Sequence, residues 1–151
     1  MIKLPNVIYD IRARDGTWCR LPYPNHPKGC PNFPRCPSER PDFRDLNFKQ
    51  WKAVIVEFDL KRYKELRREK YPNATDRQLG NLLYWQGRVR SALWKKANSI
   101  LTLGGMILDI PEASGVNIFE TMILVGIKIE RHPNIVRKVM LVGMMSDLDT
   151  L

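Results

Sequence analysis

Lys52–Phe58, KAVIVEF, is the stretch of sequence on which the prediction of the fold depends. Its run of apolar and β-branched residues predicts a strand buried on both faces, because a strand with one exposed face would alternate between apolar and polar residues. Further along the chain, stretches with strand character are interspersed with stretches of helical periodicity. This order predicts an α/β or α+β protein, in which a small mixed sheet is packed by two or three helices.

Two helices are predicted after this strand. Asp59 is a candidate N-cap for a helix from about Leu60 to Lys70. Thr75 and Gln78 fit a capping box at the start of a long helix that runs to about Leu101. The apolar residues of the long helix recur at helical spacing and are expected to face the core: Leu79, Leu82, Leu83, Val89, Leu93, Ala97 and Ile100.

The C-terminal part returns to strand patterns after Gly104-Gly105. Strands are predicted over 106–110, 127–131 and 135–144, and a short helix over 118–125 has Asn117 as its candidate cap. A weaker strand pattern covers 6–14. The length of 151 residues predicts a single domain, with an irregular segment over 1–46 and an α/β core over 47–145.

The irregular segment contains the residues most indicative of function. Trp18–Pro41, WCRLPYPNHPKGCPNFPRCPSERP, is called the cysteine segment below. It holds all three cysteines of the chain (Cys19, Cys30 and Cys36), one of the two histidines (His26) and seven of the eleven prolines. So many prolines exclude a helix, and a long loop without a core of its own needs another means of becoming ordered. An odd number of cysteines argues against a complete disulfide framework, so a bound metal is predicted.

Two metal centres suit these residues, because thiolates are soft, charged ligands of iron–sulfur clusters and of zinc. Cys19, Cys30 and Cys36 can hold a [4Fe–4S] cluster by three of its irons, which leaves the fourth iron open to a small or nucleobase-type substrate. With His26, the same cysteines would form a closed Cys₃His zinc site, which is structural in character. A third interpretation is that the cysteine segment binds no metal and is only a docking surface for a partner. None of these alternatives specifies a catalytic residue.

The chain also resembles a widespread prokaryotic family of unknown function, usually described as predicted metal-binding proteins. Gly29-Cys-Pro-Asn-Phe33, followed by Cys36-Pro37, is similar to the C-P-x-Y…C-P-P segment of that family. Glu112–Thr121, EASGVNIFET, followed by Val125-Gly-Ile and Ile129-Glu130, resembles its E-A-x-G-I-D-V-F-x-T…G…I-E pattern. Arg90–Leu93, RSAL, is similar to its middle helix. The resemblance implies a small protein with a metal bound by cysteines, and most simply an iron–sulfur centre.

The chain departs from this family in one stretch. Members of the family carry a further cysteine-rich segment between the long helix and the E-A-x-G pattern, whereas Leu101–Pro111 contains no cysteine. The gap between Cys30 and Cys36 is also shorter than in the family. The resemblance therefore implies one metal centre and no second cluster.

The charge of the chain suggests a polyanionic partner. The formal net charge is +9, and between Asp59 and Ile100 eleven Lys and Arg residues oppose four acidic residues, a net +7. A surface of this kind can attract nucleic acid or another polyanion, although it can equally be a solvated helix face. The candidate nucleic-acid contacts are Arg67, Arg68, Arg88 and Lys95.

The N-terminal residues lack the features of a signal peptide, and the chain has no run of ~18 apolar residues that could cross a membrane. We therefore expect a cytoplasmic protein without a membrane partner. This expectation agrees with the odd number of cysteines, which argues against the complete disulfide framework of a protein from an oxidising compartment.

Overall fold

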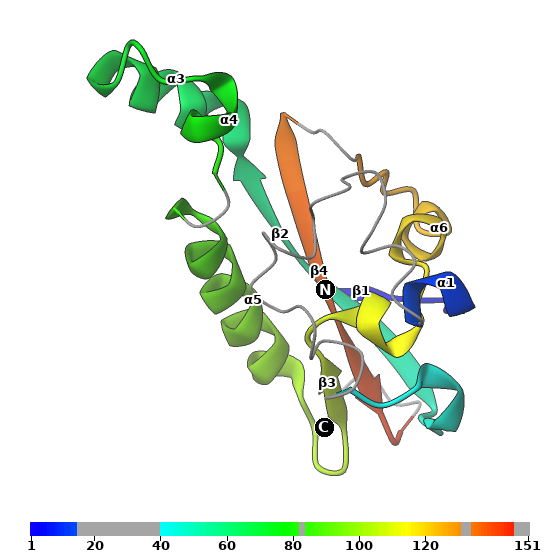
Figure 1. The fold of residues 1–151 in the computed structure, drawn as a ribbon. Coiled ribbons are helices and arrows are strands. Elements are labelled where there is room, and N and C mark those ends of the chain that lie inside the picture. Colours follow the sequence, from blue (N-terminus) through cyan, green and yellow to red (C-terminus); the bar gives the residue numbers. More distant parts are fainter. Residues whose placement is uncertain (15–39, 82–83, 131–133, 147–151) are drawn as a thin grey trace.

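The computed structural model describes residues 1–14, 40–81, 84–130 and 134–146 (Figure 1). Within these ranges the chain forms one antiparallel sheet of four strands in the order β1-β2-β4-β3. The strands are β1 (Ile2–Lys3), β2 (Gln50–Asp59), β3 (Met106–Leu108) and β4 (Ile135–Met144). The α+β alternative is therefore confirmed, while the predicted mixed sheet is corrected to an antiparallel one.

The sheet is built around the pairing of β2 with β4. The two strands pair over their whole length, from Gln50 opposite Met144 to Asp59 opposite Ile135. Ala53 and Val54 are successive residues of β2 that point to opposite faces, and they are 0% and 2% exposed. The stretch KAVIVEF therefore lies in an inner strand that is buried on both faces, as its composition predicts.

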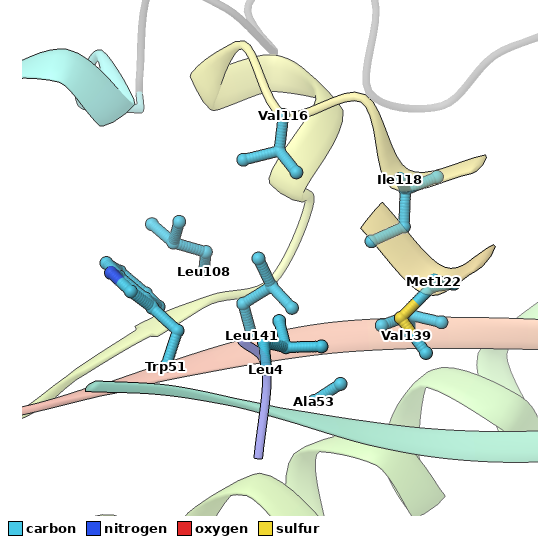
Figure 2. Packing of buried hydrophobic residues seen from close by; sticks show 9 residues of the cluster. All are labelled: Leu4, Trp51, Ala53, Leu108, Val116, Ile118, Met122, Val139 and Leu141. Atoms are coloured by element: carbon cyan, nitrogen blue, oxygen red, sulfur yellow. The ribbon is translucent and has the colours of Figure 1, made fainter. Parts of the chain in front are cut away.

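Helices cover both faces of the sheet. Figure 1 shows α5 (Gln86–Ile100) along one face of β2 and β4, with α1 (Ile11–Arg14) and α6 (Ile118–Ile123) on the other. The cluster on the α6 side is shown in Figure 2 and comprises Leu4, Trp51, Ala53, Leu108, Val116, Ile118, Met122, Val139 and Leu141. The cluster on the α5 side comprises Val54, Trp85, Val89, Leu93, Ala97, Val136, Met140, Val142 and Met144.

Several helix boundaries follow from local sequence signals. Asp59 caps α3 (Leu60–Lys70) by accepting a hydrogen bond from the backbone N–H of Arg62. Thr75 and Gln78 form the predicted capping box of α4 (Asp76–Leu79). Asn117 caps α6 through the backbone N–H of Glu120. Two short 3₁₀ helices, η2 (Phe43–Asp45) and η4 (Pro111–Ser114), complete the described elements.

The single long helix predicted from Thr75 to about Leu101 is wrong, because α4 ends at Leu79 and α5 begins only at Gln86. Gly80 terminates α4, and Trp85 turns its indole into the core, where its Nε1 donates to the carbonyl oxygen of Gly80 at 3.1 Å. Of the predicted inward-facing residues, Leu79, Val89, Leu93 and Ala97 are buried and Ile100 is partly buried, while Leu82 and Leu83 lie outside the described residues.

Two predicted strands are also wrong. Residues 127–130 form no strand, because Ile127 and Ile129 pack their side chains on the core while their backbone joins no ladder. Residues 6–14 make only an isolated bridge, Tyr9 with Val116, and end in the single turn of α1. In both stretches some apolar residues pack against the core, Val7 in the first and Ile127 and Ile129 in the second, and strand periodicity alone does not distinguish such packing from pairing.

Candidate functional site

The predicted metal ligands Cys19, His26, Cys30 and Cys36 lie outside the described residues, between Arg14 and Arg40. The structure does describe the two stretches that lead into and out of this part of the chain. Tyr9–Arg14 is called the entry below, and Arg40–Asp45 the exit. Both are joined to the core at and beside η4, so the candidate site is considered from these anchors.

Arg14, the last residue of α1, connects the entry with the exit. Its Nη1 donates to the carbonyl oxygen of Arg40 at 2.7 Å and to that of Ala113, in η4, at 2.8 Å. One guanidinium group thus holds three segments that are far apart in sequence. Because the two ends are already brought together, part of the entropy cost of closing the loop between them is met by the fold.

Asp109 provides a second anchor for the exit. Arg40 donates to it through two nitrogens, Nε at 3.2 Å and Nη2 at 2.9 Å, and Arg90 of α5 approaches the same carboxylate at 3.3 Å. The side chains of Asp109 and Arg40 are only 17% and 18% exposed. Burial alone would raise the pKa of Asp109, but the hydrogen bonds and charge of Arg40, with the charge of Arg90, bring that pKa below its ordinary value. The carboxylate therefore stays ionised and holds Arg40 in a bidentate pair.

Tyr9, Asp42 and Arg44 form a polar cluster that joins the entry to the exit. Asp42 accepts a hydrogen bond from the backbone N–H of Arg44 and pairs with the guanidinium of the same residue at 2.8 Å. That guanidinium lies 4.6 Å from the centroid of the Tyr9 ring, and the Tyr9 hydroxyl donates to Asp42 at 3.4 Å. The hydrogen bond from Arg44 is the main reason why the pKa of Asp42 falls from 3.8 to about 2.

This pKa gives a prediction for the dependence of stability on pH. A carboxyl group whose pKa is lowered by folding contributes stability that is present above its unfolded pKa and is lost as pH falls through its folded pKa. We expect Asp42→Asn to lower the free energy of unfolding by about 1 kcal/mol at pH 6, a value discounted for solvent screening of the half-exposed pair. The difference should disappear between pH 4 and about 2. Urea unfolding at pH 6 and at pH 2.5 measures it.

A matched control for this prediction is Asp45→Asn, which removes an exposed carboxylate from the same 3₁₀ turn. It should change the free energy of unfolding by less than about 0.5 kcal/mol at either pH, as is usual for an exposed site. A deficit in Asp42→Asn that is as large at pH 2.5 as at pH 6 would show that the loss does not come from the ionised pair.

η4 and Gly115 form the part of the core against which the entry lies. The backbone N–H of Asp10 donates to the carbonyl oxygen of Gly115 at 2.7 Å. Gly115 has a φ of +95° and packs against the ring of Tyr9, which leaves no room for a Cβ. Within η4, Glu112 is partly buried, and desolvation raises its pKa. Two backbone carbonyls of this region accept hydrogen bonds from the entry, that of Ala113 from Arg14 and that of Gly115 from Asp10.

Glu112–Thr121 lies against the entry, because Arg14 bonds to Ala113 and Tyr9 bridges to Val116. Sequence reasoning singled out Glu112–Thr121 but not the anchors Arg14, Arg40 and Asp109, which lie far apart in the sequence.

The predicted nucleic-acid contacts lie on two helices. Arg67 and Arg68 belong to α3, and Arg88 and Lys95 belong to α5. Arg68, Arg88 and Lys95 are exposed, whereas Arg67 is partly buried among tyrosines. Figure 1 shows α3 and α4 beyond the N-terminal end of α5, so the four residues do not belong to one helix face.

Arg67 is surrounded by three tyrosine rings, and these four residues are called the tyrosine cluster below. Its guanidinium carbon lies 4.5 Å from the centroid of Tyr84, 5.2 Å from that of Tyr71 and 5.6 Å from that of Tyr63. A hollow of about 400 Å³ opens beside this cluster, lined by Arg67, Tyr71, Ala74, Gln78, Leu79 and Tyr84. The sequence analysis did not predict this hollow, because its walls come from three separate stretches of the chain.

In the part of the chain that the structure describes, no group of three or more His, Cys, Asp or Glu side chains is placed to hold a metal ion. Among the same residues, no helix is both long enough and apolar enough to cross a membrane.

Comparisons of the chain with protein-family models, with curated proteins and with solved structures gave no match. The functional interpretation therefore depends on the residues of this chain and on their arrangement.

Proposed function

We propose that this chain is a metal-binding protein whose centre is an iron–sulfur cluster held by Cys19, Cys30 and Cys36, with a zinc site on the same cysteines and His26 as the alternative. The observation that carries the proposal is that Arg14 joins the entry, the exit and η4. A loop with fixed ends loses less entropy when it is ordered by a metal than one with free ends.

The donor set agrees with either centre. Three thiolates match an iron–sulfur cluster that keeps one iron open, and three thiolates with an imidazole match closed tetrahedral zinc. Cys30 and Cys36 are each followed by proline, which restricts the backbone just after each ligand. When bound, a cluster with three thiolate ligands would supply an iron that can act as a Lewis acid toward a small or nucleobase-type substrate.

The proposal predicts the metal content and colour of the purified protein. Protein purified without oxygen is expected to be brown and to contain about four iron and four sulfide per chain, because the three thiolates suit a [4Fe–4S] cluster. Cys36→Ser should lose most of this iron, sulfide and visible absorbance. Metal analysis, sulfide assay and the visible spectrum measure all three.

Ser38→Ala is a matched control, since it alters the same segment without removing a thiolate. It should retain the metal content of the unaltered chain. A colourless protein with about one zinc and no sulfide would overturn the cluster in favour of the Cys₃His site. A protein with neither metal, whose folding is unaffected when all three cysteines become serine, would overturn both.

A further inference from the structure

The tyrosine cluster presents an arginine whose charge is not neutralised by an acid. Within the described residues no salt bridge involves Arg67, and its Nε is buried without a hydrogen-bond acceptor. The three rings hold the guanidinium by cation–π contact. A guanidinium held in this way is ordered in advance for an anion such as a phosphate.

The hollow beside Arg67 combines this charge with exposed aromatic surface. Tyr84 is 56% exposed and Tyr71 is 45% exposed, although large aromatic side chains are usually buried. The volume of about 400 Å³ falls within the range of small-ligand sites. Tyrosine rings beside an arginine suit a ligand that has both a flat aromatic part and a negative charge.

The charge around the cluster extends this preference beyond a single small molecule. α3 also carries Lys61, Arg62, Lys64, Arg68 and Lys70. On α5, Arg88 and Lys95 are exposed and lie seven residues apart, so they share one helix face. Tyr84 precedes α5 and contacts Arg67 of α3, so the cluster lies between α3 and the residue that leads into α5.

We propose that the tyrosine cluster is a binding site for single-stranded nucleic acid, in which an unpaired base stacks on Tyr84 or Tyr71 and a neighbouring phosphate pairs with Arg67. Only unpaired bases expose the faces that tyrosine can stack on, which favours a single strand over a duplex. The flanking charges of α3 and α5 would follow the backbone on either side. This function goes beyond metal binding and does not require the metal.

Fluorescence anisotropy of the full chain with labelled 15-nucleotide oligo-dT and oligo-U tests the proposal. Binding to at least one of them is expected at low salt and should weaken as salt is raised, since phosphate contacts release counterions. Oligo-dT and oligo-U both offer unpaired bases and phosphates, so comparison of their affinities shows whether the site prefers DNA or RNA. A duplex of equal length should bind more weakly.

Tyr84→Ala should weaken binding by roughly 5- to 150-fold, which corresponds to the loss of one stacked base. Tyr84→Phe keeps the ring and should stay within about twofold of the unaltered chain. Arg137→Ala, on β4, removes an equal charge from a residue that is already bonded to Glu57 and should likewise change affinity by less than about twofold. Circular dichroism of each variant shows whether its fold is intact.

The proposal is overturned if Tyr84→Ala, folded, binds within twofold of the unaltered chain, or if neither oligonucleotide binds at low salt. Equal affinity for duplex and single strand would also overturn it, because it would indicate attraction by charge alone. Arg67→Glu is the second variant. If the phosphate pairs with Arg67 at the cluster, Arg67→Glu should abolish binding. If the phosphate does not pair there, Arg67→Glu should weaken binding no more than Lys61→Glu on the same helix.

Discussion

Trp85→Ala is expected to lower the free energy of unfolding by about 4 kcal/mol, because truncation of a fully packed tryptophan leaves a large cavity. The Trp85 side chain is 2% exposed, and its ring stacks on Phe58 with centroids 4.9 Å apart and planes 7° from parallel. It also donates from Nε1 to Gly80 at 3.1 Å, so the substitution leaves that carbonyl without its partner. Urea unfolding followed by circular dichroism measures the change.

Trp94→Ala provides the matched control, since Trp94 lies on the same helix and is 37% exposed. Its loss should cost about 1 kcal/mol or less. Equal costs for the two variants would mean that burial at the start of α5 does not determine the stability of this part of the fold. A large cost for Trp85→Ala alone would confirm that the turn between α4 and α5 is held by the core.

In this region the sequence predicted the start of α4 and the end of α5, but not the break between the two helices. The capping box of Thr75 and Gln78 is a local signal, and it was confirmed. The break after Leu79 depends on the burial of Trp85 against Phe58 of β2, a contact between residues far apart in the chain. Leu82 and Val89 are nevertheless seven residues apart, a helical spacing that extends across the break, which is why periodicity alone predicted one continuous helix.

The sheet shows the same division between local and long-range information. KAVIVEF identified an inner strand because its composition reports burial on both faces. It did not report the direction of its neighbours, and the predicted mixed sheet is antiparallel. Residues 127–130 were predicted as a strand because their apolar residues alternate, but Ile127 and Ile129 pack on the core without joining the sheet.

For the cysteine segment, which lies outside the described residues, the metal remains a prediction from the sequence. It depends on the residue types alone, because thiolates can serve as metal ligands in any fold. The anchors Arg14, Arg40 and Asp109 are separated by up to 95 residues, and no pattern in the sequence links them. The tyrosine cluster likewise depends on the turn that brings Tyr84 next to Arg67, so the basic residues were found and the aromatic ones were missed.

Gly115→Ala is expected to lower the free energy of unfolding by about 3 kcal/mol, the sum of a left-handed backbone and an overpacked contact. Gly115 has a φ of +95°, and an added Cβ would overlap the ring of Tyr9. The ring cannot simply turn away, because it lies under the Arg44 guanidinium and its hydroxyl donates to Asp42. The strain therefore falls on the contact between the entry and η4. Thermal or urea unfolding measures the loss.

Gly87→Ala is the control for this substitution, because nothing lies within 4 Å of a Cβ at that position of α5. It should stabilise the chain by up to about 1 kcal/mol, as alanine favours a helix over glycine. In the double variant Gly115→Ala/Tyr9→Ala, the overlap is removed. Its loss of unfolding free energy should therefore be smaller than the sum of the losses in the two single variants. Strict additivity would show that the cost of Gly115→Ala comes from its backbone alone.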